Sequence, residues 1–204
     1  IVDVSRMQRV APAPATQELL SGIEGPKYLF VGQMLPHKRP DLLLKSFHAL
    51  STYIEPDAHL FMVGAGRLPN YLEVVHQFVK ELNLHRAYLT GPVSDEDLAA
   101  FYQGCDVFVT PSEHEGFCIP LLEAMAFELP IVARDFAAIP ETLGGAGLLL
   151  DAEATVLGLA EGMHELIANR ELVETYRRLG KDRLEAFDAD RSRATFLSHI
   201  AELV

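Results

Sequence analysis

Two glutamates stand eight positions apart in the segment EGFCIPLLEAMA, which spans residues 115–126 and otherwise has the character of an apolar helix. Proline is favoured in the first turn of a helix, so Pro120 predicts that the helix begins beside it. The amides of residues 117–119 then precede the helix with few acceptors of their own. Such amides can bind a diphosphate, with Glu123 in the first turn and Glu115 just outside it.

A second candidate for anion binding is the segment GQMLPHKRPD, residues 32–41, which follows an apolar run. Gly32 permits an unusual turn, and Lys38 and Arg39 stand just before a helix whose first position is predicted at Pro40. Two cations at a helix start suit an anion. A solvated turn in which Asp41 offsets the helix dipole is the alternative, and the segment alone leaves both open.

The segment GAGRLP, residues 64–69, has two of the glycines of a dinucleotide-binding fingerprint. Its third glycine is replaced by Pro69, and it follows the second predicted strand instead of opening the first strand–helix–strand unit. Nicotinamide dinucleotide binding is therefore not predicted. A tight turn at Gly64 that lets a base or a ribose approach the backbone remains compatible with the segment.

The segment TGPVSDEDL, residues 90–98, predicts a helix start, because Ser94 and Asp97 have the spacing of a capping box. Asp95 is not needed for this cap. Its carboxylate can accept two hydrogen bonds from the N1 and N2 edge of guanine, which hints at a guanine base.

Two hydrolase motifs are incomplete in this sequence. His114 and Glu115 lack the second histidine of HExxH, and Ser112 lies in PSE instead of a GxSxG elbow. No set of residues with metal-ligand spacing is predicted.

Composition excludes some further classes of protein. The 17 basic and 29 acidic side chains give a formal charge of -12, which disfavours nucleic acid as a partner. No tract of about 18 uncharged apolar residues predicts a membrane span. Two cysteines in 204 residues indicate reduced, packed thiols and favour the cytosol.

Short apolar runs alternate with helical patterns from residue 28 to residue 151. Such runs joined by helices predict a Rossmann-like, doubly wound α/β domain with a parallel sheet of about six strands. Because ligands of these sheets bind outside the carboxyl ends of the strands, the loops after Gly32, Gly64, Gly91 and Pro111 are expected to line one cleft. The predicted strands are 28–32, 59–64, 87–91, 106–111, 131–135 and 147–151, and the helices are 41–50, 71–82, 95–104 and 120–128.

The two ends of the chain differ from this pattern. Residues 1–26 carry three prolines without clear periodicity and are interpreted as a linker or edge segment, with one domain at 27–204. Helical stripes predict a helical C-terminal tail after residue 152, with a last helix near 194–203. The chain begins with Ile1 and shows no signal segment, which indicates a fragment of a longer protein.

Several segments in this order resemble the retaining glycosyltransferases of family 4, two-domain enzymes of GT-B architecture that bind a nucleotide-sugar in the C-terminal half. The segments, over about residues 28–151, are FVGQMLPHKRPDLLLKSF, FMVGAGRL, LTGPVSDEDLAAFYQGCDVFVTPSEHEGF, PLLEAMAFELPIV and PETLGGAGLLL. In this family two glutamates are spaced as Glu115 and Glu123 are. The resemblance implies that Glu115 accepts hydrogen bonds from the donor sugar and Glu123 from the ribose, while Lys38 and the loop amides face the diphosphate.

The sequence departs from the family at a few positions. Gln33 stands where an arginine is frequent, and Arg39, Cys118 and Glu128 stand where glycine is common. Arg39 is interpreted as a cation that compensates for the missing arginine at position 33. The candidate catalytic residues are Lys38 and Glu115, and the candidate donor-binding residues are Gly32, Gln33, Lys38, Arg39, Gly64, Val93, Asp95, Glu115, Gly116, Phe117, Cys118, Ile119 and Glu123.

The resemblance implies retaining transfer from a nucleotide-diphosphate sugar, without a metal or another cofactor, in polysaccharide biosynthesis. Asp95 and the KRPD turn favour GDP-mannose over UDP- or ADP-hexoses as the donor. The acceptor, a glycan, a lipid-linked sugar or a small molecule, is expected on an N-terminal domain absent from this chain, which can also supply peripheral membrane association. The isolated chain is therefore expected to be inactive in transfer. Alternatives are a non-catalytic nucleotide-sugar-binding module and an epimerase or phosphorylase of similar fold.

Overall fold

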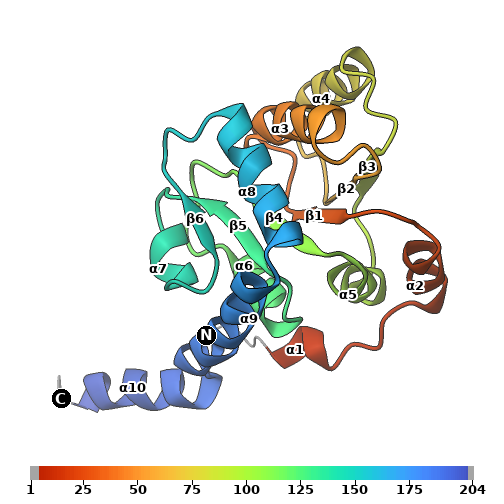
Figure 1. Cartoon of the computed structure of the whole chain (residues 1–204). Coiled ribbons are helices and arrows are strands. Elements are labelled where there is room, and N and C mark those ends of the chain that lie inside the picture. The colour runs from red at the N-terminus through yellow and green to blue at the C-terminus, as the bar shows by residue number, and fades with distance from the viewer. Residues whose placement is uncertain (1–4, 202–204) are drawn as a thin grey trace.

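A six-stranded, all-parallel sheet forms the centre of the molecule (Figure 1). The computed structural model describes residues 5–201, with side chains for 7–188, 193–194 and 196–200. The strand order β3-β2-β1-β4-β5-β6 confirms the predicted Rossmann-like, doubly wound sheet. The strands are β1 Lys27–Val31, β2 His59–Val63, β3 Ala87–Gly91, β4 Val107–Thr110, β5 Ile131–Arg134 and β6 Leu148–Leu150.

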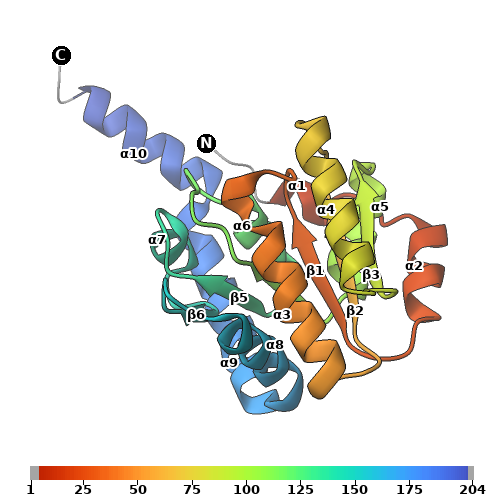
Figure 2. The same cartoon turned by 90° about the horizontal axis from the view of Figure 1, so that it is seen from above.

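Helices cover both faces of this sheet (Figures 1 and 2). Side chains of β1 alternate between two apolar cores, since Tyr28 and Phe30 pack with α3, α4 and α8, whereas Leu29 packs with α2, α5, α6 and α7. The helices are α1 Ser5–Gln8, α2 Pro14–Ser21, α3 Pro40–Tyr53, α4 Pro69–Glu81, α5 Asp95–Gly104, α6 Ile119–Ala126, α7 Ile139–Leu143, α8 Val156–Ala168, α9 Arg170–Leu184 and α10 Ala189–Ala201, with 3-10 turns η1 Pro36–Lys38 and η2 Glu185–Phe187.

Part of the N-terminal segment, which the sequence predicted to be a linker or edge segment, is helical. Residues 14–21 form α2, which packs on α5 with Leu20 fully buried, so this part belongs to the domain. Proline usually indicates irregular structure, but Pro14 occupies the first turn of α2, where proline is tolerated. Residues 1–4 lie outside the described part of the chain.

The C-terminal part is helical, as the sequence predicted. Helices α8 and α9 pack on the sheet and on α6, while α10 extends away from the rest of the molecule in both views (Figures 1 and 2). Residues 202–203 of the predicted last helix lie outside the described part. Within residues 5–201, no helix combines the length and the hydropathy that crossing a bilayer requires.

Candidate functional site

The loops at the carboxyl ends of β3, β2, β1 and β4 are joined by backbone hydrogen bonds. Gly64 N–H donates to Gly91 O at 3.0 Å, Met34 N–H to Ala65 O at 3.0 Å, and Glu113 N–H to His37 O at 2.8 Å. The strand order reverses between β1 and β4, where ligands of doubly wound sheets bind. The predicted candidate loops therefore meet along one edge of the sheet.

Gly64 is required where the loops after β1 and β2 touch. Its φ of 143° is rare for residues with a side chain, and a Cβ there would collide with the carbonyl oxygen of Gly32. The two glycines that the sequence singled out thus lie in direct contact.

Lys38 and Glu115 form an ion pair between the β1–α3 loop, residues 32–39, and the β4–α6 loop, residues 111–118. The Lys38 side chain is 17% exposed and the Glu115 side chain 9% exposed, so the pair is largely shielded from water. Lys38 ends the turn η1, which is closed by a bond from Lys38 N–H to Leu35 O. The structure thus brings the two predicted catalytic residues together.

Arg39 follows in a left-handed conformation with φ of 52° and precedes α3, whose first residue is Pro40 as predicted. Its Nε donates to Asp41 Oδ1 at 2.9 Å, and a terminal nitrogen donates to Glu113. Burial opposes ionisation of Asp41, but the hydrogen bond and charge of Arg39, together with the Leu42 amide and the charge of Lys45, outweigh it and lower the pKa of Asp41. Arg39 is therefore a cation already paired within the protein.

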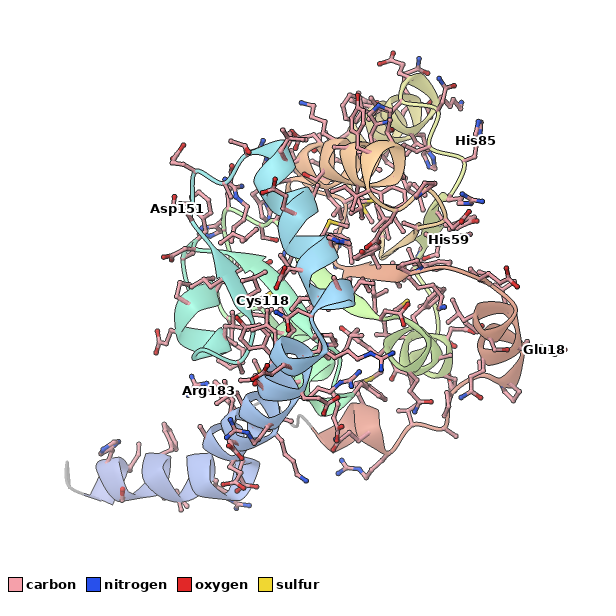
Figure 3. All side chains as sticks on the ribbon, in the orientation of Figure 1. Glu18, His59, His85, Cys118, Asp151 and Arg183 are labelled. Atoms are coloured by element: carbon pink, nitrogen blue, oxygen red, sulfur yellow. The ribbon has the colours of Figure 1, made fainter. Side chains whose placement is uncertain are left out.

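Helix α6 begins at Ile119, with Cys118 at its N-cap, so Pro120 occupies the second helical position. Cys118 is buried in a left-handed conformation with φ of 62° (Figure 3). Burial, followed by the nearby charge of Glu115, raises the pKa of the Cys118 thiol to about 12. Cys118 is thus a neutral packing residue whose conformation suits glycine better.

Glu123 points from α6 towards α5, where it accepts a hydrogen bond from the Tyr102 hydroxyl at 2.8 Å. Tyr102 is itself buried and stacks on Phe127 with ring centroids 5.4 Å apart. Burial, with the adjacent carboxylate, raises the pKa of Tyr102, so the phenol stays protonated and donates. One oxygen of Glu123 is thereby oriented by a rigid neighbour.

The remaining predicted residues lie around these pairs. Val93 and Phe117 pack against the apolar cluster that contains Cys118, whereas Gly116 and Ile119 are exposed. Asp95 is the exposed first residue of α5, after the predicted cap in which Ser94 Oγ accepts from Asp97 N–H. Asp95 and Gln33 thus lie at the predicted edge, after β3 and β1 respectively.

Sequence reasoning missed three side chains that support the site: Tyr102, Glu113 and Arg134. Arg134 ends β5 with 5% of its surface exposed, and it donates to Glu113 at 3.4 Å and to Pro111 O at 3.3 Å. Its guanidinium also lies over the Phe136 ring. A signal was available, because an arginine that ends the apolar strand IVAR needs buried acceptors.

Two large hollows of the structure lie away from the candidate residues. Openings of about 720 and 750 Å³ are at the amino ends of the strands, around Pro26, and contain none of the candidate residues. Within the described residues, no three His, Cys, Asp or Glu side chains are arranged to hold a metal ion.

Comparison with known proteins connects this geometry to a family. The model of the family described as glycosyl transferases group 1 matches residues 16–183. The chain belongs to the group 1 glycosyl transferases. The match begins inside α2, in agreement with the packing of this helix on the domain.

Two curated relatives of this group 1 glycosyl transferase are similar over most of the chain. An uncharacterised glycosyltransferase of Methanocaldococcus jannaschii is 30% identical over 164 residues, which are 80% of this chain and 44% of the relative. A GDP-mannose-dependent alpha-mannosyltransferase of Mycolicibacterium smegmatis is 35% identical over 144 residues, 69% of this chain and 34% of the relative. The chain thus spans less than half the length of these relatives.

A solved structure agrees with the fold of the group 1 glycosyl transferase. The C-terminal domain of a group 1 family glycosyl transferase from Francisella tularensis superposes with a TM-score of 0.71 and 21% identity. The alignment covers 88% of this chain and 96% of that domain. At this identity the likeness supports the fold alone.

Proposed function

We propose that the chain is the donor-binding domain of a retaining hexosyltransferase that uses a nucleotide-diphosphate sugar, with GDP-mannose as the favoured donor. The observation that carries this proposal is the contact of Lys38 with Glu115 at the reversal of strand order, with Glu123 about one turn into α6. The family supplies the transferase chemistry, and the similar mannosyltransferase, whose name specifies GDP-mannose, supports the choice of donor.

In this proposal Lys38 and the amides before α6 stabilise the diphosphate as the glycosidic bond breaks. A preorganised donor aimed at the developing charge lowers the reaction barrier by about 3 kcal/mol. The ion pair with Glu115 holds Lys38 in place before the donor arrives. Once the phosphates attract Lys38, the Glu115 oxygens become acceptors for the sugar hydroxyls.

Glu123 binds the ribose hydroxyls in the same scheme, with Tyr102 fixing one of its oxygens. Neither glutamate acts as a general acid, and the transfer requires no metal ion. The acceptor, a glycan, lipid-linked or small-molecule hydroxyl, approaches from a second domain that lies outside this chain, consistent with the partial span of the relatives. The two buried free thiols, Cys105 and Cys118, fit the cytosol.

Thermal unfolding of the chain with GDP-mannose, UDP-glucose and ADP-glucose tests the proposed donor. A ligand at about 100 times its dissociation constant adds about 2.7 kcal/mol to the free energy of unfolding. GDP-mannose is expected to raise the melting temperature most. A larger rise with another donor would overturn the base assignment, and no rise with any of them would overturn the donor-binding role.

A further inference from the structure

Helix α7 holds the β4–α6 loop at two points. Ala138 N–H, just before this helix, donates to Glu115 O at 3.4 Å, and the Thr142 hydroxyl donates to Phe117 O at 2.7 Å. The two accepting carbonyls flank Gly116. Neither Ala138 nor Thr142 was among the residues predicted for the site, yet both fix the orientation of its backbone.

These two bonds also determine where the neighbouring amides point. A trans peptide is planar with its C=O and N–H directed oppositely, and residues 5–201 contain no cis peptide. Because the Glu115 and Phe117 carbonyls face α7, the N–H groups of Gly116 and Cys118 face away from it. Among the described residues, neither N–H donates to a backbone carbonyl.

Thr142 is suited to hold this orientation because it is itself held firmly. Its side chain is buried, with 2% of the residue exposed. Arg183, near the end of α9 (Figure 3), donates from Nε to Thr142 O at 3.2 Å. The Arg183 guanidinium lies 4.6 Å from the Phe187 ring centroid, and Phe187 meets Phe117 edge-on at 5.5 Å. Thr142, Arg183 and Phe187 thus contact one another in series, and both ends of the series contact Phe117.

We propose that Thr142 is a positioning residue that directs the Cys118 amide at the diphosphate. The proposal rests on the donor-binding role given above. Thr142 touches no substrate; it acts through the Phe117–Cys118 peptide, whose carbonyl it anchors. Without the hydroxyl, this peptide can rotate and its N–H loses its direction. The loss is specific to the phosphates, because the nucleoside binds elsewhere on the edge.

Thr142→Val tests the proposal, since it removes the hydroxyl at nearly constant volume. Calorimetry measures the dissociation constant of GDP, and NMR titration measures that of guanosine, whose binding is weaker. Loss of one oriented bond to a charged phosphate corresponds to about a tenfold rise in the dissociation constant of GDP. The dissociation constant of guanosine is expected to change less than about twofold. Thr142→Ser, which keeps the hydroxyl, is expected to restore GDP binding.

Thr175→Val is the matched control, because Thr175 on α9 also donates its hydroxyl to a carbonyl, Glu171 O at 2.9 Å. It is expected to leave both dissociation constants unchanged. If Thr142→Val does not fold, Thr142→Ala provides the same comparison. An unchanged ratio of the guanosine and GDP constants in a folded hydroxyl-free variant overturns the positioning role. Failure of the unaltered chain to bind GDP overturns the choice of guanine, and failure to bind GDP, UDP or ADP overturns the donor-binding role and this inference with it.

Discussion

Within residues 5–201, five non-glycine residues have a left-handed backbone conformation: Arg39, Asn83, Cys118, Glu128 and Ala137. Residues with a Cβ lose roughly 1–2 kcal/mol in this conformation relative to glycine. Three of the five, Arg39, Cys118 and Glu128, are the positions where the sequence departs from a glycine common in the resembling family. The structure gives these departures a physical meaning, because the backbone keeps the conformation that glycine favours.

Glu128→Gly is expected to stabilise the chain. Glu128 has φ of 54°, is exposed, and follows α6, so glycine relieves backbone strain without removing a packed side chain. After the larger chain entropy of glycine in the unfolded state is subtracted, the free energy of unfolding should rise by about 0.5–1 kcal/mol. Urea denaturation measures this change.

Glu161→Gly provides the control, because Glu161 is exposed in the right-handed interior of α8. The same exchange there should lower the free energy of unfolding by about 1 kcal/mol. Equal effects at the two positions would show that backbone conformation is not the cause.

At the scale of elements, hydrogen bonds among charged side chains connect three loops. Glu113 in the β4–α6 loop accepts from Arg39 before α3 and from Arg134 at the end of β5. Arg134 also donates to Ala152 O in the loop after β6. Because Arg39 directly follows Lys38, this network restrains the loop that carries the predicted phosphate ligand.

Arg134→Met is expected to lower the free energy of unfolding by about 2–3 kcal/mol. The exchange leaves two backbone carbonyls without their buried donor, whereas Glu113 Oε1 keeps its bond from Arg39, which limits the loss. Urea denaturation measures it. Arg178→Met on the exposed side of α9 is the control and should change stability by less than about 0.5 kcal/mol. Equal losses in both variants would contradict a structural role for the network.

The elements differ in how far the sequence predicts them. Strands that are buried on both faces can be recognised in the sequence as apolar runs. Because parallel strands end at one edge of the sheet, the loops that carry Lys38 and Glu115 were expected to lie together, and the two side chains are in contact. The contacts of Arg134 with Glu113 and of Thr142 with Phe117 join a strand and a helix to a loop more than 20 residues away in sequence, and they depend on side-chain direction. No periodicity encodes them, so they required the structure.

At the scale of the whole molecule, the sheet order explains why one edge collects the candidate residues. The crossovers on either side of β1 and β4 diverge there, which leaves the starts of α3 and α6 facing the same region. The chain spans 44% and 34% of two relatives. Donor binding is the property expected of this chain alone.

Calorimetric titration of GDP-mannose into the unaltered chain, Lys38→Ala and Glu123→Ala tests the central claim most directly. Lys80→Ala and Glu73→Ala, exposed positions on α4, are the controls. The unaltered chain and both controls are expected to bind. Each site variant is expected to have a dissociation constant at least about tenfold higher, because each loses a bond to a charged group. Unchanged binding in both Lys38→Ala and Glu123→Ala would contradict the central claim.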